Sequence, residues 1–187
     1  DALRRRTEAL EIGDPRERDV FIGPLIDGKA MKTFTGAVEQ VRKDGGTVIT
    51  GGKIRDGGPL SRGYYAEPTL VTGLPPGHPI ERRELFVPLI LVATFSTLEE
   101  ALGRANDTEY GLTAGIMSES PREVQTFFDR IEAGTVYANR PQGATTGAWP
   151  GLQPFGGWKA STITNKAAGG DYYLQQFLRE QSQTTYS

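Results

Sequence analysis

The segment "VPLILVATFSTLEEALGRANDTEYGLTAGIM", residues 87–117, carries the clearest structural signals in the chain. Its apolar run, residues 87–95, predicts a buried strand, and residues 111–117 predict a second strand. Between them, Thr97 and Glu100 form a capping box, in which the hydroxyl and the carboxylate satisfy amides at the start of a helix. The segment therefore predicts a strand, a helix and another strand. The apolar side of that helix is formed by Leu98, Ala101, Leu102 and Ala105.

The same alternation continues downstream. Ser120, Pro121 and Glu123 predict another helix start, because proline suits the first helical position. Gly134 ends this helix, and "TVYA", residues 135–138, predicts a third strand. The order β-α-β-α-β with short connections predicts an α/β fold with an open, mainly parallel sheet flanked by helices. The apolar stripe of the second helix is formed by Val124, Phe127, Phe128 and Ile131.

Upstream, the pattern predicts one more helix and a short strand. The Gly45–Gly46 pair ends the helix, and residues 47–50 form the strand. Residues 51–63, "GGKIRDGGPLSRG", are so rich in turn residues that they predict an exposed loop. Apolar residues fall at helical spacing at Ala30, Phe34, Ala37, Val38 and Val41.

The composition is that of one soluble globular domain: 187 residues, 37% hydrophobic, 24% charged and net charge −2. The cationic run at residues 4–6 is a solvated helix face, so no basic patch points to nucleic acid. The longest apolar run, residues 85–95, is too short to span a bilayer and is broken by Pro88. No signal peptide is visible. We therefore expect a cytoplasmic protein without nucleic-acid or membrane partners.

The chain has no cysteine and one histidine, His78. Disulfides, zinc-cysteine sites and thiol chemistry within the chain are thereby excluded, and one histidine cannot build a histidine metal site. We interpret His78 as a loop residue without a catalytic role. The chain begins at Asp1 within a helical pattern, from which we expect a fragment or a processed product.

The glycine-rich stretch "GATTGAWPGLQPFGGWK", residues 143–159, follows the third strand, where open parallel sheets bind ligands. It is not a phosphate-binding loop, because Gly157 stands where that pattern needs lysine. One interpretation is a structural loop held by its aromatic residues. The other is a substrate-anchoring loop, in which the amides of Gly147 and Ala148 bind a carboxylate and Phe155 covers an apolar part of the ligand.

Seven segments in order resemble the C-terminal part of an NAD-dependent aldehyde dehydrogenase, over nearly the whole chain. They are "DVFIGPLID", "GGTVITGGK", "GYYAEPTLV", "ELFVPLILVATF", "ALGRANDTEYGLTAGIMS", "IEAGTVYANR" and "QPFGGWKAS". The glycine-rich stretch with "KAAGGDYYLQQFLREQSQT" is most similar to the 1-pyrroline-5-carboxylate dehydrogenases. These enzymes oxidise glutamate γ-semialdehyde, a small aldehyde, to glutamate in proline catabolism.

The resemblance implies a role for five residues. Glu84 in "ELF" matches the glutamate that holds the nicotinamide-ribose hydroxyls of NAD, and Phe86 matches an aromatic residue near the nicotinamide. The alternatives are a surface glutamate and a core aromatic. Gly147 and Ala148 match the pair that grips the α-carboxylate of the substrate, and Phe155 matches the aromatic on its methylenes.

The chain departs from the family in three ways. Val87–Pro88 stands where Gly-Pro is usual, and Thr162 stands where glycine is common. The cysteine nucleophile of the family is absent, so the chain holds no catalytic residue and we expect it to be inactive without the remaining N-terminal part of the enzyme. Two alternatives remain open: a stand-alone, non-catalytic assembly module, and an aldehyde dehydrogenase of other specificity.

The resemblance also divides the chain, into residues 1–170 of the catalytic domain and an oligomerisation tail, residues 171–187. Residues 173–177 predict a short helix, and residues 178–186 predict a strand that is polar on both faces. Such a strand needs a sheet edge to satisfy its amides, and in the family it joins a neighbouring subunit. We therefore expect a homo-oligomer, with a frayed terminus as the alternative.

Overall fold

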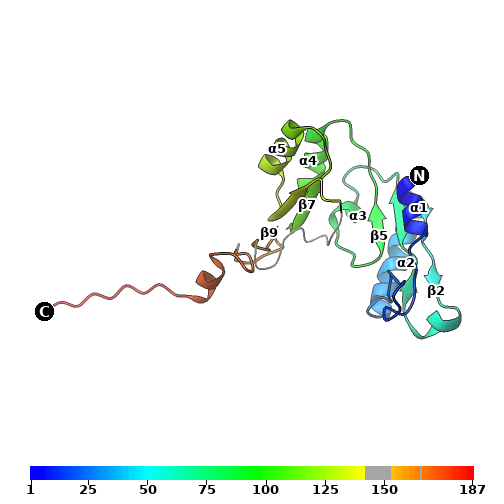
Figure 1. The fold of residues 1–187 in the computed structure, drawn as a ribbon, viewed down its shortest axis with the longest axis horizontal. Coiled ribbons are helices and arrows are strands. Elements are labelled where there is room, and N and C mark those ends of the chain that lie inside the picture. The colour runs from blue at the N-terminus through cyan, green and yellow to red at the C-terminus, as the bar shows by residue number, and fades with distance from the viewer. Residues whose placement is uncertain (142–152, 165) are drawn as a thin grey trace. The chain divides into compact units, whose positions relative to one another are not determined.

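The computed structural model describes residues 1–141, 153–164 and 166–187, shown in Figure 1. The chain forms two compact units, Asp1–Thr94 and Phe95–Ser187. Both units combine helices with small sheets, which confirms the α/β fold class.

The first unit is built on the three-stranded sheet β1-β4-β5, in which β1 and β4 run antiparallel and β4 and β5 run parallel. A separate antiparallel pair, β2-β3, adjoins it in sequence. The elements are α1 (Ala2–Glu8), α2 (Gly28–Lys43), β1 (Thr47–Thr50), β2 (Ile54–Arg55), the 3-10 helix η1 (Gly58–Arg62), β3 (Tyr65–Ala66), β4 (Thr69–Thr72), α3 (Pro79–Arg82) and β5 (Leu89–Leu91).

Helix α2 supplies the core of the first unit. Asp27 caps it, with a carboxylate oxygen that accepts from the amide of Ala30 at 2.7 Å. The predicted stripe is confirmed, because Phe34 and Val41 are fully buried and Val38 is 2% exposed. Burying each such side chain stabilises the fold by roughly 1.5–3 kcal/mol, so this face fixes the helix to its sheet.

The second unit contains the parallel pair β7-β8, with Thr113 opposite Thr135 and Ile116 opposite Ala138. Helices α4 and α5 pack together on one side of this pair, around buried Leu102. The elements are α4 (Leu98–Asn106), β6 (Tyr110–Gly111), β7 (Thr113–Ile116), α5 (Pro121–Arg130), β8 (Thr135–Ala138), β9 (Trp158–Lys159) and the 3-10 helix η2 (Tyr173–Phe177).

The helix starts in the second unit follow from the predicted caps. The Thr97 hydroxyl accepts from the Glu100 amide at 3.2 Å, and the Ser120 hydroxyl accepts from the Glu123 amide at 3.3 Å. The Glu100 carboxylate accepts from the amide of Ser96 at 2.8 Å, one residue before the expected partner. Both caps still satisfy amides that the first helical turn leaves free.

Three local predictions need correction. The first strand of the β-α-β-α-β series, β5, is shorter than predicted and only partly buried, since Ile90 is 56% exposed. It pairs with β4 in the first unit, whereas β7 pairs with β8. The sequence pattern gave no strand at β4, whose buried residues form the partner that β5 uses. The predicted loop at residues 51–63 is largely exposed but includes β2 and η1. Helix α5 ends at Arg130 rather than Gly134, because Ile131 is already extended.

The C-terminal residues are exposed. The predicted short helix is confirmed as η2, and the residues after it, 178–187, carry no assigned secondary structure. No strand of the described chain pairs with them. Their role in oligomerisation stays a prediction, as does the division of the chain at residue 170.

Candidate functional site

The segment "ELF" lies in the first unit, between α3 and β5, and presents two side chains to solvent. Glu84 is exposed, and Phe86 is 83% exposed. Leu85 between them is partly buried and lines a cavity of about 690 Å³ beside α2. The alternation leaves a carboxylate and an aromatic ring, two residues apart, free to contact a ligand.

Phe86 also has an unusual backbone. Its φ is +54°, in the left-handed region that bulky residues rarely adopt. Such a conformation costs on the order of 1–3 kcal/mol and tends to occur at functional sites. The Phe86 ring contacts little of this chain, and its place near the nicotinamide stays a prediction.

Phe155 lies in the second unit and has a fixed backbone. Its amide donates to the carbonyl of Ala168 at 2.9 Å, and the amide of Ala168 donates to the Phe155 carbonyl at 2.8 Å. The side chain is partly buried. Gly147 and Ala148, the pair expected to grip a carboxylate, lie outside the described residues.

The two glycines after Phe155 occupy positions without room for a side chain. A Cβ on Gly156 would lie 2.8 Å from Ala167 Cα, and one on Gly157 would lie 2.4 Å from Ser161 Cβ. A Cβ on Gly134, at the start of β8, would lie 2.1 Å from the Gly156 carbonyl oxygen. The Thr135 hydroxyl donates to that same carbonyl at 3.4 Å. The turn after Phe155 is therefore pressed against the start of β8.

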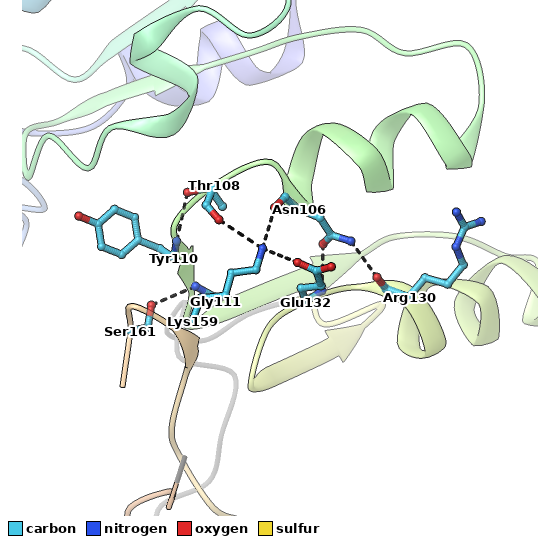
Figure 2. A network of polar contacts seen from close by, with 8 residues as sticks. All are labelled: Asn106, Thr108, Tyr110, Gly111, Arg130, Glu132, Lys159 and Ser161. Carbon is cyan, nitrogen blue, oxygen red and sulfur yellow. Dashed lines mark hydrogen bonds and ion pairs between the residues drawn. The ribbon is translucent and has the colours of Figure 1, made fainter. Parts of the chain in front are cut away.

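Lys159 closes this turn through a polar network (Figure 2). Its ammonium donates to the carbonyls of Asn106 at 2.6 Å and Thr108 at 3.2 Å, and pairs with the Glu132 carboxylate at 2.6 Å. Asn106 then links two segments, because its side-chain amide donates to the Arg130 carbonyl at 2.8 Å and its side-chain oxygen accepts from the Glu132 amide at 2.9 Å. The network thus joins the ends of α4 and α5 to β9.

A family model described as the aldehyde dehydrogenase family matches residues 1–183. The chain belongs to the aldehyde dehydrogenase family. The assignment drawn from the seven sequence segments is confirmed.

Several relatives of this aldehyde dehydrogenase chain are named 1-pyrroline-5-carboxylate dehydrogenase, and one is named aminoaldehyde dehydrogenase. A 1-pyrroline-5-carboxylate dehydrogenase of Bacillus licheniformis is 36% identical over 166 residues, which cover 89% of this chain and 31% of that protein. A peroxisomal aminoaldehyde dehydrogenase of Pisum sativum is 32% identical over 187 residues, which cover 100% of this chain and 35% of that protein.

Solved structures agree with the fold. The 1-pyrroline-5-carboxylate dehydrogenase from Thermus with bound NAD matches with a TM-score of 0.84 and 34% identity, over 95% of this chain and 32% of that one. The betaine aldehyde dehydrogenase of Staphylococcus aureus in complex with NAD+ matches with a TM-score of 0.83 and 28% identity, over 94% of this chain and 34% of that one. This aldehyde dehydrogenase chain spans about a third of the length of these relatives.

In this aldehyde dehydrogenase chain, the predicted site residues occupy both units. Glu84 and Phe86 lie in the first unit, and Phe155 lies in the second. Sequence reasoning quoted Lys159 within a motif but gave it no role. The signal in the sequence is a lysine two residues after the Gly156–Gly157 pair, although two of its partners are backbone carbonyls, which leave no trace in a sequence.

His78 is buried and hydrogen-bonded, unlike the loop histidine expected from the sequence. It is 8% exposed, its Nδ1 accepts from the Ile80 amide at 3.2 Å, and its Nε2 lies 2.8 Å from the Asp44 carboxylate. The acceptor role of Nδ1 puts the proton on Nε2, which donates to Asp44. Hydrogen bonds from Gln40 and then His78 lower the pKa of Asp44. These contacts explain His78 as a structural residue at the start of α3.

Metal and membrane features are lacking over the described part of this aldehyde dehydrogenase chain. Within residues 1–141, 153–164 and 166–187, no three His, Asp or Glu side chains gather closely enough to hold a metal ion. Over the same ranges, no helix has the length and apolar character needed to traverse a bilayer.

Proposed function

We propose that this chain is part of an NAD-dependent aldehyde dehydrogenase that oxidises glutamate γ-semialdehyde to glutamate in proline catabolism. The observation that carries the proposal is the 36% identity over 166 residues with a 1-pyrroline-5-carboxylate dehydrogenase. The anchor-loop sequence around Gly147 and Ala148 supports the same substrate, because adjacent backbone amides suit a carboxylate.

The first unit would contribute the nicotinamide end of the cofactor site. The Glu84 carboxylate can accept hydrogen bonds from two neighbouring ribose hydroxyls, and the exposed Phe86 ring offers a flat apolar surface for the nicotinamide. These residues fit NAD, which, when bound, takes up the hydride that leaves the aldehyde carbon. Glu84 and Phe86 therefore orient the ring rather than react with the substrate.

The second unit would contribute the substrate pocket. The amides of Gly147 and Ala148 would bind the α-carboxylate, and Phe155 would cover the methylenes. The backbone hydrogen bonds between Phe155 and Ala168 support this role, because a backbone that is already fixed loses little freedom on binding. The nucleophilic cysteine must come from outside these 187 residues, since they contain none.

A second specificity is favoured by one observation. The aminoaldehyde dehydrogenase of Pisum sativum matches across 187 residues, the whole of this chain. An aminoaldehyde carries an ammonium group and no carboxylate, whereas glutamate γ-semialdehyde carries both on its α-carbon, so only the semialdehyde needs a carboxylate anchor. A non-catalytic assembly module remains the alternative for the chain alone.

One kinetic experiment tests these possibilities. The purified chain and a complete dehydrogenase subunit that carries it are each supplied with NAD and glutamate γ-semialdehyde, 4-aminobutanal or propanal, and NADH is followed by absorbance. We expect no NADH from the chain alone, and the largest kcat/KM of the complete subunit with glutamate γ-semialdehyde. A larger kcat/KM with 4-aminobutanal would mean that the enzyme prefers an aminoaldehyde and that the proposed substrate is wrong. Turnover by the chain alone would contradict the need for an external cysteine.

We also propose that the tail, residues 171–187, connects subunits of a homo-oligomer. Its apolar side chains support this, because Leu174, Phe177 and Leu178 are 70%, 68% and 72% exposed. Deleting residues 178–187 from the complete subunit should lower its mass in solution, as measured by light scattering. A truncated subunit that keeps the oligomer size of the parent would exclude residues 178–187 as the connector.

A further inference from the structure

Lys159 has a backbone conformation that requires an explanation. Its φ is +53°, in the left-handed region, which lysine seldom adopts without compensation. It lies in β9, a strand of two residues whose ladder partners among the described residues are Tyr110 and Gly111. So short a strand does not by itself hold a strained residue, so the side chain has to contribute.

The side chain of Lys159 uses all of its donors. Its ammonium has three N–H groups, and three oxygens receive them: the carbonyls of Asn106 and Thr108 and the Glu132 carboxylate. The side chain is 23% exposed, whereas that of Glu132 is 52% exposed. Because the Asn106 carbonyl ends α4, the ammonium also meets the negative end of that helix.

A displacement at Lys159 would be passed on to Phe155. Only Gly156, Gly157 and Trp158 separate the two residues. The Gly156 carbonyl is confined by Gly134, and Gly157 is confined by the backbone of Leu112, 3.2 Å from where a Cβ would stand. A turn without spare room cannot absorb a shift, so it transmits one.

We infer that Lys159 is a positioning residue, which sets the place of Phe155 and thereby the preference for a substrate with a carbon chain between its aldehyde and its carboxylate. The substrate named here rests on the proposed function. Lys159 acts through the turn and does not touch the substrate. Its network fixes the loop from one side, and the paired Phe155 and Ala168 amides fix it from the other.

The direct test is hydrogen exchange in the complete subunit, without substrate. Lys159→Met keeps the length of the side chain and removes every hydrogen bond, so the amides of Phe155 and Ala168 should exchange on the order of tenfold faster. Glu132→Gln removes only the charge pair and should give a smaller increase. Lys53→Met, the same change at an exposed lysine of the first unit, is the matched control and should leave these amides unchanged. Unchanged exchange in Lys159→Met would overturn the inference.

The kinetic test separates positioning from general stability. Lys159→Met should lower kcat/KM for glutamate γ-semialdehyde on the order of tenfold more than for propanal, mainly through KM. Lys159→Arg, which keeps the charge, should recover part of that difference. An equal loss on both aldehydes would overturn the positioning role. A parent enzyme that does not prefer the semialdehyde would instead refute the proposed substrate, and the exchange test would still decide the role of Lys159.

Discussion

Residues 84–86 leave a carboxylate and an aromatic ring exposed, whereas residues 155–159 are held by backbone hydrogen bonds, close-packed glycines and a lysine network. Both segments contain one non-glycine residue at positive φ, Phe86 and Lys159. In the second segment, the described contacts account for that strain. In the first segment, the Phe86 ring is so exposed that its contacts within this chain do little to offset the strain of the positive φ.

The difference indicates two ways to prepare a binding site. A segment fixed by its own contacts can select a small substrate by shape, because little freedom is lost when the substrate binds. The exposed side chains of the other segment make their contacts when a larger ligand binds. They therefore contribute little to the stability of the fold. Substitutions that introduce a clash should therefore damage stability at the fixed segment, whereas substitutions at the exposed segment should change activity with little effect on stability.

The largest expected effect is loss of stability at the fixed segment. Gly134→Ala places a Cβ 2.1 Å from the backbone oxygen of Gly156, which cannot move without shifting the whole turn. We expect the free energy of unfolding to fall by about 3 kcal/mol, measured by urea denaturation. Gly36→Ala in α2 is the control, because nothing lies within 4 Å of its added Cβ. That change should be neutral or stabilise the protein by up to about 1 kcal/mol. Equal stabilities of the two variants would mean that the turn is not close-packed.

The next effect is loss of turnover at the exposed segment. Glu84→Gln keeps the shape of the side chain but weakens its grip on the ribose hydroxyls, so a misplaced nicotinamide should lower kcat of the complete subunit roughly tenfold to a hundredfold. KM for the aldehyde and the unfolding midpoint should hardly change. Glu39→Gln, the same change at an exposed position of α2, is the matched control for steady-state kinetics with NAD. An unaltered kcat in Glu84→Gln would remove Glu84 from the cofactor site.

The contrast between the segments also explains what the sequence could foretell. Helices α4 and α5 were predictable because their caps, Thr97 and Ser120, and their apolar stripes are local signals. Strand β8 was predictable because glycine and turn residues bound a short β-branched run. The family motifs likewise pointed to Glu84 and Phe155.

The missed features depend on partners that are distant in the chain. Pairing of β5 with β4 depends on a short buried strand, residues 69–72, whose sequence "TLVT" has no alternating pattern. The Lys159 network joins residues 106, 108, 132 and 159 and uses two backbone carbonyls, which any residue type provides. Local patterns cannot identify either feature, because tertiary packing selects them.

The smallest expected effect is the change in the free energy of unfolding when the Phe86 ring is removed. Its size decides whether Phe86 is a core residue or an aromatic residue that contacts the ligand. Phe86→Gly relieves the positive φ, which glycine adopts freely, but it also gives the unfolded chain more freedom, at a cost of about 0.4–1 kcal/mol. Because the ring is 83% exposed, its removal loses little burial, and the free energy of unfolding should change by less than about 1 kcal/mol. Phe34→Ala, at a fully buried ring of α2, should cost about 3–5 kcal/mol in the same urea denaturation. A comparable loss in Phe86→Gly would make Phe86 a core residue after all, whereas a stable variant with reduced kcat would assign its ring to the cofactor.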